Sequence, residues 1–510
     1  MQKRFLKLGA AVLASILATG LALPAQAQKA GGVLNIATIG EPPTLDPMAS
    51  TADLVGIISQ HIFETLYTFG DGWKLTPLLA AELPAITDGG KTYTIKLRQD
   101  VTFHDGSAMT AADVVASLKR WSEIAVRGKQ AAAQIDSITA SGNDSVVIKL
   151  KEPFAPLLSL LAFNNSAAVI LPASKQPAQL TEFVGTGPYK FKERQPDRYV
   201  VLTKNDKYAS RSGNADFYGG ARKPYVDELR FVPVPNANTR VEAAIAGQYQ
   251  FVDSLPVEAY PRLKDAKSDG VLIKPFGWPI MFFNTKQGSL ANPAVRRAVL
   301  ASLSFSDMME AAFGSKDFYE VDGSLYPKGF VYHSMAGTEA YNKPDPAKAK
   351  KAAADAGYKG EPVRILTSMQ YEFHYKMAAV AGEYLKQAGF KVDMQVVDWA
   401  TLTQRRNDPA LWEIYFTHSP FLPEPALNNM MNNNAPGWWA TPEKDKLVAA
   451  FNTESDSAKR VAILADLQKL MYQEVPLAKV GNFNAVGAKA KNLQGFVPSP
   501  WPFFWNTWLD

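Results

Sequence analysis

The side chains most suited to acid–base catalysis or metal binding are the five histidines, at positions 61, 104, 333, 374 and 418. No two of them stand at the spacing of a metal site, and the sequence contains no H-E-x-x-H, P-loop or G-x-S-x-G motif. A lone histidine is more often an ordinary surface or core residue than a catalytic or metal-binding one. Aspartate and glutamate are plentiful, but no two of them stand out as an acid/base couple. The residues therefore predict neither a catalytic centre nor a metal or cofactor site.

Two further patterns bear on ligand binding. Gly185-x-Gly187 is a weak candidate for a phosphate-binding loop, because Pro188 and a strand follow it instead of a helix. The chain also has 10 tryptophans, 19 tyrosines and 27 phenylalanines. Most of these rings will be core residues, but an α/β protein that encloses a small molecule also lines its cleft with such rings.

The stretch from Trp412 to Trp439 is the most suggestive single segment. It opens with an apolar run over 412–416, typical of a buried strand, and then becomes a polar loop with His418, Ser419, Phe421 and Glu424. Three prolines make that loop stiff. A rigid loop that leaves the end of a strand is a common place for a ligand in α/β proteins. The alternative is a tight surface connection without a role.

The amino terminus has the pattern of a secretory signal peptide. Three basic residues precede an uncharged run from Leu8 to Leu23, and Ala25-Gln26-Ala27 forms an A-x-A cleavage site. The run is shorter than the roughly 20 apolar residues that cross a bilayer. We predict that residues 1–27 are a signal peptide cleaved after Ala27, and that the mature chain of 483 residues is released into the periplasm.

Charge and cysteine content narrow the possible partners. Removing the signal takes away three basic and no acidic residues, which lowers the formal net charge from +5 to +2. A chain so close to neutral lacks the basic footprint of a nucleic-acid or anionic-membrane binder. The absence of cysteine excludes both disulfides and a lipidated cysteine. Stability must then come from a large core, divided between domains.

The hydrophobic periodicity predicts alternating strands and helices. Strands are expected at 32–39, 91–97, 145–150, 199–203, 225–234, 249–252 and 277–284. Helices are expected at 52–69, 110–121, 238–246, 345–356, 442–451 and 458–472, with a further one beginning at Pro293. The segments 363–368, 371–387 and 391–397 predict a βαβ-like unit. The aromatic tail around Trp501 and Trp505 is expected to dock into a core.

Seven stretches, in this order along the chain, resemble the family 5 extracellular solute-binding proteins of bacterial ABC transporters, which bind peptides, opines, sugars and nickel complexes. They are Glu41-Pro-Pro-Thr-Leu-Asp-Pro47, Phe63-Glu-Thr-Leu-Tyr67, Thr92 to Arg98, Val101 to Ser107 with Thr110 to Val114, Gly185-Thr-Gly-Pro-Tyr189, Asn292 to Ala298 and Asp345 to Ala349. Each stretch alone is a weak signal. The ordered set spans nearly the whole mature chain and is highly specific.

The resemblance implies an α/β, two-lobe periplasmic-binding-protein fold with an extra inserted subdomain, the class II or cluster C type. The implied boundaries are 28–68, 186–280 and 486–510 for the core of lobe I, 69–185 for the subdomain inserted in it, and 281–485 for lobe II. The crossings near 276–283 and 480–486 would be the hinge. Solute bound to both lobes would stabilise a closed form that the permease recognises.

The resemblance also assigns a specificity role to the loop after Trp412. Oligopeptide and dipeptide binders carry an aspartate there that pairs with the peptide's amine, and this chain has Phe421 in its place. His418 stands where a tryptophan is common. Arg406 falls at a position that approaches ligand carboxylates, and His374 falls on the ligand side before a helix; both can also be ordinary surface residues. The remaining predicted ligand-binding residues are Thr417, Ser419, Trp278, Trp438, Trp439 and Glu41.

The resulting prediction is a periplasmic, non-enzymatic binding component of an ABC importer. Its partners would be a small solute and the inner-membrane permease, and we expect a monomer without cofactor or metal. The side chains suit an anionic or hydroxyl-rich solute, so peptide-like, opine-like and sugar-like compounds all remain open. The alternative is a secreted hydrolase acting on peptides or glycans.

Overall fold

The computed structural model describes residues 28–454 and 456–510. The predicted signal peptide and its cleavage site lie outside these residues. None of the helices in the described part of the chain is long and apolar enough to cross a membrane.

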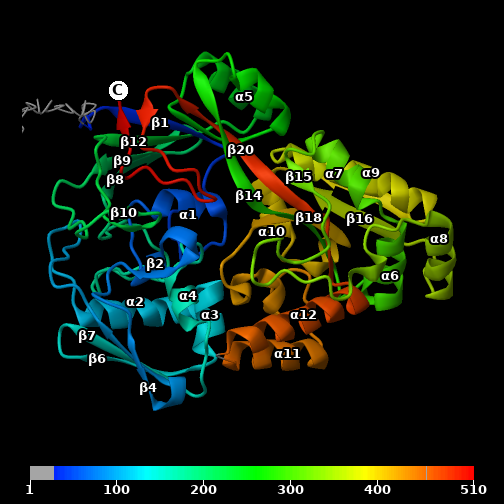
Figure 1. The fold of residues 1–510 in the computed structure, drawn as a ribbon, viewed down its shortest axis with the longest axis horizontal. Helices are drawn as coiled ribbons and strands as arrows, with labels where there is room; N and C mark the ends of the chain where they lie inside the picture. Colours follow the sequence, from blue (N-terminus) through cyan, green and yellow to red (C-terminus); the bar gives the residue numbers. More distant parts are fainter. Residues whose placement is uncertain (1–27, 455) are drawn as a thin grey trace, which may run out of the picture.

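A large mixed sheet runs through the molecule and organises it (Figure 1). Its strands, in spatial order, are β17 (Lys391–Val396), β16 (Pro362–Thr367), β18 (Ile414–Pro420), β14 (Ser268–Phe283), β20 (Asn482–Ala490), β13 (Phe251–Leu255), β1 (Val33–Thr38), β12 (Glu228–Pro233), β9 (Tyr199–Lys204) and β8 (Tyr189–Gln195), with β15 (Tyr319–Glu320) and β19 (Leu477–Lys479) attached to β20 and β14. The pairs β1–β12, β1–β13, β16–β17 and β16–β18 are parallel, and the other pairs are antiparallel.

The helices lie in two groups, one on each side of the long strands β14 and β20 (Figure 1). The α-helices are α1 (Asp53–Ser59), α2 (Ala111–Ile124), α3 (Val126–Ala132), α4 (Leu157–Ala162), α5 (Ala237–Ala246), α6 (Pro293–Ser302), α7 (Phe305–Phe313), α8 (Pro346–Asp355), α9 (Glu372–Gln387), α10 (Trp399–Arg405), α11 (Pro442–Thr453) and α12 (Ser457–Glu474). Short 3-10 turns are η1 (Asp71–Trp73), η2 (Asp88–Gly90), η3 (Val257–Leu263), η4 (Ser289–Ala291), η5 (Thr338–Ala340), η6 (Pro409–Leu411), η7 (Pro425–Leu427) and η8 (Asn429–Met431).

A separate four-stranded sheet, packed against α2 and α3, lies at the lower left of Figure 1. Its strands are β4 (Ala85–Thr87), β5 (Thr92–Lys96), β7 (Ser145–Leu150) and β6 (Ile135–Ser141). Three two-stranded ribbons complete the fold: β2 (Tyr67–Phe69) with β3 (Leu75–Pro77), β10 (Ala215–Asp216) with β11 (Gly219–Gly220), and β21 (Leu493–Gln494) with β22 (Trp508–Leu509).

The strands β14 and β20 connect the two groups of elements. The first half of β14, from Ser268 to Ile273, pairs with the part of β20 that lies beside β13. The second half, from Gly277 to Phe283, pairs with β18. The predicted α/β class is confirmed, and the long strand explains how one sheet spans both groups. The lobe boundaries drawn from the sequence stay predictions.

Most predicted elements are present within a few residues of their expected ends. Thr110 and Asp113 form the predicted capping box, with the Thr110 N–H donating to the Asp113 carboxylate at 2.8 Å. The carboxyl-terminal tail docks as expected, since Trp501 and Trp505 are fully buried in the same hydrophobic cluster as α1.

The prediction of one helix over 52–69 is wrong, because α1 ends at Ser59. The main-chain carbonyls of His61 and Ile62 accept hydrogen bonds from Tyr189 and Gly187, both at 2.9 Å. A side chain at Gly187 would meet the His61 carbonyl oxygen at 2.4 Å. Gly185 and Gly187 therefore allow two backbones to approach each other closely, which is a packing role and not a phosphate-binding one.

Candidate functional site

A cavity of about 320 Å³ lies where the two groups of elements face each other. One wall comes from the loop after β1, the start of α1 and α3, with Glu41, Asp53 and Arg127. The opposite wall comes from β14, β18, α10 and the η7–η8 segment, and includes Arg406 and His418. We call it the Arg406 cavity. Its size falls in the range of small-molecule sites, roughly 300–1,000 Å³.

The strand β18 presents an open main-chain edge to this cavity. The Asn284 N–H bonds to the Glu413 carbonyl, and the Phe421 N–H bonds to the Phe276 carbonyl, both at 2.9 Å. Because hydrogen-bonded and non-bonded pairs alternate along an antiparallel ladder, the N–H and C=O of His418 must point away from β14. On that side β16 pairs only with Ile414 and Tyr415. Apart from a long hydrogen bond of 3.5 Å from the Thr417 hydroxyl to its carbonyl, the main chain at His418 is thus open to pairing with an extended amide-containing molecule.

Arg406 contributes a positive charge to the same wall. It follows the last residue of α10, where its main-chain carbonyl accepts a bond from the Trp412 indole at 3.1 Å. Its Nε is buried and has no hydrogen-bond partner in the described part of the chain, and no carboxylate there lies within 4.0 Å of its guanidinium. An unpaired guanidinium in a cavity wall is a suitable receptor for a carboxylate, which it can bind in a bidentate manner.

The facing wall holds a second arginine and an aspartate. Arg127 donates to the Asn165 carbonyl at 3.1 Å, and burial lowers the pKa of its guanidinium to about 10. Asp53 accepts hydrogen bonds from the Trp501 indole at 2.8 Å and from the Asn165 amide at 3.2 Å. Burial raises the pKa of Asp53, while these bonds and the charges of Arg127 and Arg406 oppose that rise. The cavity therefore contains charges of both signs.

Contacts across the cavity join its two walls. Arg127 donates to the Leu427 carbonyl at 3.0 Å, and Gln130 donates to the Ala426 carbonyl at 3.1 Å. On the other flank, Lys376 pairs with Glu258 at 2.6 Å. These bonds hold the two groups of elements together around the cavity.

The half-buried His418 of this wall pairs with His374, which is fully buried behind it. His374 Nε2 lies 3.0 Å from His418 Nδ1, so one ring donates a proton to the other. Burial lowers the pKa of His418 to about 3 and lowers the pKa of His374 well below its ordinary value. Both rings are therefore neutral at pH 7, and neither supplies a positive charge to the cavity.

We predict that the His418→Gln variant weakens the pH dependence of stability. The unfolded chain binds a proton at His418 below about pH 6.5 while the folded chain does not, so the unfolding free energy falls as pH decreases from 6.5 towards 4. A single such histidine contributes about 1.4 kcal/mol per pH unit. Urea unfolding of the ligand-free protein at several pH values should show a slope smaller by that amount in the variant. An unchanged slope would contradict the assigned protonation state.

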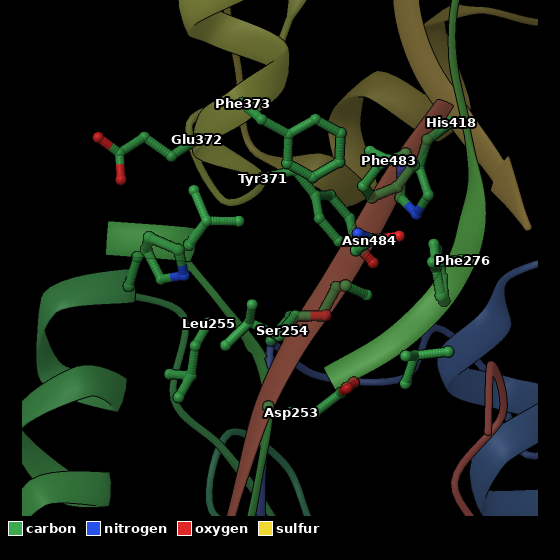
Figure 2. Close-up of a pocket in the computed structure, with 18 of the residues that line it drawn as sticks. Asp253, Ser254, Leu255, Phe276, Tyr371, Glu372, Phe373, His418, Phe483 and Asn484 are labelled. Carbon is green, nitrogen blue, oxygen red and sulfur yellow. The ribbon is translucent and has the colours of Figure 1, made fainter. Parts of the chain in front are cut away.

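A second cavity, of about 80 Å³, adjoins the first (Figure 2). The two share Asp53, Tyr371 and His418 in their walls. Asp253 and Ser254 from β13 also line the second cavity, together with aromatic, aliphatic and charged side chains, and we call it the Asp253 cavity. Within the described residues, no three His, Cys, Asp or Glu side chains are grouped so that they could hold a metal ion.

The structure separates the residues predicted from sequence into three groups. Six line the Arg406 cavity: Glu41, Trp278, Arg406, Thr417, His418 and Ser419. His374 lies behind His418, as described above. Phe421, Trp438 and Trp439 line neither large cavity. Phe421 packs against Phe330 with ring centroids 5.8 Å apart, and Trp438 stacks on Trp412. The ligand-binding role of each stays a prediction.

Several residues that line the cavities were not among the predicted ligand-binding residues. Asp53, Arg127, Asn165, Asp253 and Tyr371 line the cavities but come from five separate segments. None of them forms a motif with its sequence neighbours. Only Asp253 could have been suspected from the sequence, because a carboxylate beside the apolar residues Phe251 and Val252 is costly to bury and is unusual without a function.

Comparisons with known proteins identify the family. The model for bacterial extracellular solute-binding proteins, family 5, matches residues 74–438. A probable peptide ABC transporter periplasmic-binding protein of Sinorhizobium fredii is 27% identical over 485 residues, covering 90% of each chain. The glutathione-binding protein GsiB of Escherichia coli K12 is 26% identical over 481 residues, again covering 90% of each chain.

Solved structures share the fold. AgaA of A. tumefaciens R10, in complex with agropinic acid, has a TM-score of 0.80 and 25% identity, covering 94% of this chain and 99% of that one. DppA of Helicobacter pylori, in complex with the peptide STSA, has a TM-score of 0.82 and 21% identity, covering 94% and 98%. The two-lobe periplasmic-binding-protein fold is thereby confirmed. The chain belongs to the family 5 bacterial extracellular solute-binding proteins.

Proposed function

We propose that the protein captures a small solute with a carboxylate and at least one amide or amine group, and delivers it to the permease of an ABC importer. The observation that carries this proposal is the Arg406 guanidinium, which lies in the wall of the Arg406 cavity without an ion-pair partner in the described chain. The open main-chain edge at His418 supports the amide part of the proposal, because it can extend a ladder with an extended chain.

These features favour some solute classes over others. A neutral sugar has no group that would compensate the unpaired Arg406 charge, whereas a peptide or an opine has a carboxylate. Relatives named for peptide, glutathione and agropinic acid are consistent with this, since all three solutes carry carboxylates next to nitrogen. We therefore place the solute among peptide-like and opine-like acids.

Closure would follow from binding on both walls. A solute held by Arg406 and His418 on one side and by the Asp53 side of the cavity on the other bonds best when the walls are together, so it shifts the population to the closed form. The hydrogen bonds from Arg127 to Leu427 and from Gln130 to Ala426 would then further stabilise the closed form. No covalent bond of the solute needs to change.

We infer that the protein works as a monomer in the periplasm after cleavage behind Ala27.

Thermal unfolding of the purified mature chain tests this function. Ala-Ala-Ala at a hundredfold excess over its Kd should add about 2.7 kcal/mol to the unfolding free energy and raise Tm. Ala-Ala-Ala amide, which lacks the carboxylate, should give a clearly smaller shift. Equal shifts for the two peptides would contradict a carboxylate site at Arg406. Consumption of the peptide by the protein would contradict transport and support a hydrolase.

A further inference from the structure

The backbone around Asp253 is shaped to push this side chain out of its sheet. The register between β13 and β20 shifts between Val252 and Leu255, which marks a bulge. Ser254 has φ of +50°, in the left-handed region that a side chain makes unfavourable. Arg240 donates to the Ser254 carbonyl at 2.9 Å and holds this conformation in place. Strained backbone of this kind is commonly found where a side chain must be aimed at a ligand.

The aimed side chain is a carboxylate without a close ion pair. No lysine, arginine or histidine nitrogen of the described chain lies within 4.0 Å of the Asp253 carboxylate. Figure 2 shows this group pointing from β13 towards the cavity, on the side opposite Tyr371 and Phe373. Burial raises its pKa to about 6, although the charge of Arg240 and hydrogen bonds from Ser254 oppose that rise, so the ligand-free protein keeps this charge at a cost in stability.

Asp53 adds a second carboxylate to the same cavity. Its Oδ1 accepts both hydrogen bonds described above, from Trp501 and Asn165. Its charge is one of the causes that raise the pKa of Asp253, which places the two carboxylates within electrostatic reach of each other. Their mutual repulsion would be relieved by a cation between them.

Aromatic rings form the rest of the wall. Tyr371 and His418 have ring centroids 4.7 Å apart, Phe276 and Phe483 are 5.2 Å apart, and Phe373 lies 5.1 Å from Phe483. The faces of such rings attract ammonium and guanidinium groups. His418 is neutral, so it does not repel them.

The other charges around the cavity leave it negative. Arg240 directs its guanidinium to the main-chain carbonyls of Val234, Pro235 and Ser254. Lys376 is bound at the rim by Glu258 and Glu372. Arg240 and Lys376 thus face four carboxylates, those of Asp53, Asp253, Glu258 and Glu372.

We propose that the Asp253 cavity is a subsite for a cationic group of the solute, an ammonium or guanidinium held by Asp253 and Asp53 against the rings of Tyr371, Phe276 and Phe483. This inference rests on the proposed function, because it concerns the same solute. The cation enters the Asp253 cavity while the carboxylate of the solute binds Arg406 in the adjoining cavity. The solute is therefore a zwitterion, and Phe421 need not anchor its amine.

Calorimetric titration at pH 7.5 tests this subsite with three proteins: wild type, Asp253→Asn and Asp269→Asn. Asp269 is a matched control, since it is an exposed aspartate on β14 that does not line the cavity. Ala-Ala-Ala should bind the Asp253→Asn variant at least tenfold more weakly than the other two. N-acetyl-Ala-Ala-Ala, which has no amine, should bind all three proteins equally and more weakly than Ala-Ala-Ala binds wild type.

A probe that carries only a cationic group tests the Asp253 cavity without relying on peptide binding. Butylammonium at millimolar concentration should raise the Tm of wild type and Asp269→Asn but not of Asp253→Asn, and butanol should have no effect. A response to butylammonium that survives in Asp253→Asn, or its absence in wild type, would overturn the subsite. The Asp253→Asn protein should fold, because the substitution removes a buried charge, and its ligand-free Tm should equal or exceed that of wild type.

The outcomes also separate the two proposals. Arg406-dependent binding of Ala-Ala-Ala that is indifferent to acetylation would keep the transport function and overturn the cation subsite. A response to butylammonium that depends on Asp253, without any binding of Ala-Ala-Ala, would keep the subsite and overturn the peptide-like solute.

Discussion

Replacing Arg406 with alanine is expected to weaken the binding of Ala-Ala-Ala at least thirtyfold. A bidentate bond between a guanidinium and a carboxylate in a partly buried site contributes about 2 kcal/mol or more. A loss of that size corresponds to roughly thirtyfold in Kd. The variant should fold normally, because the guanidinium has no ion pair in the described chain that the substitution could break.

Arg405→Ala is the matched control, since Arg405 precedes Arg406 but is exposed and lines neither cavity. Titration of both variants with Ala-Ala-Ala and with its carboxyl-terminal amide measures how much the peptide carboxylate contributes to binding in each. The Arg406→Ala variant should lose its preference for the free acid, whereas Arg405→Ala should keep it. If Arg406→Ala still prefers the acid by the wild-type factor, the carboxylate binds elsewhere.

Replacing Phe421 with aspartate is expected to destabilise the ligand-free protein by about 3 kcal/mol or more, because it removes a buried aromatic ring and buries a charge. The Phe421 side chain is 4% exposed and packs against Tyr326 and Phe330. The Lys479 ammonium lies 5.7 Å from the ring centroid. An aspartate here would pair with Lys479 and not with a solute.

Phe421→Leu keeps an apolar side chain of intermediate size and should lose less stability than Phe421→Asp. Urea unfolding measures the difference, and titration with Ala-Ala-Ala in the two variants measures any change in amine binding. We expect no gain in affinity for free amines in Phe421→Asp. A variant that stays as stable as wild type and binds amines more tightly would show that Phe421 borders the solute after all.

Local sequence features predicted those parts of the fold that depend on neighbours in the chain. The capping box at Thr110 and the strands around Val33 and Lys391 follow from periodicity and hydrogen-bonding residues within a few positions. The helix expected to run to Phe69 fails because Gly187 and Tyr189, more than a hundred positions away, take the carbonyls that the helix would have used. Such competition is invisible to local patterns.

The site shows the same division. The segment after Trp412 could be recognised from the sequence as a candidate ligand-binding segment, and its residues Thr417, His418 and Ser419 do line the Arg406 cavity. The strand β18 nevertheless extends to Pro420, where a loop was expected after Phe416, so the main chain itself takes part in the cavity wall. Asp53, hydrogen-bonded to Trp501 near the end of the chain, and Asp253, exposed by a bulge, depend on tertiary contacts that no single segment encodes.

Native mass spectrometry of protein secreted from cells grown in rich medium tests the central claim most directly. We expect wild type to carry one equivalent of a small solute that is released on unfolding, contains both a carboxylate and a basic nitrogen, and is absent from the Arg406→Ala/Asp253→Asn double variant. A solute retained equally by the double variant, or one without a carboxylate, would contradict the assignment of these two cavities as the binding site of a zwitterionic solute.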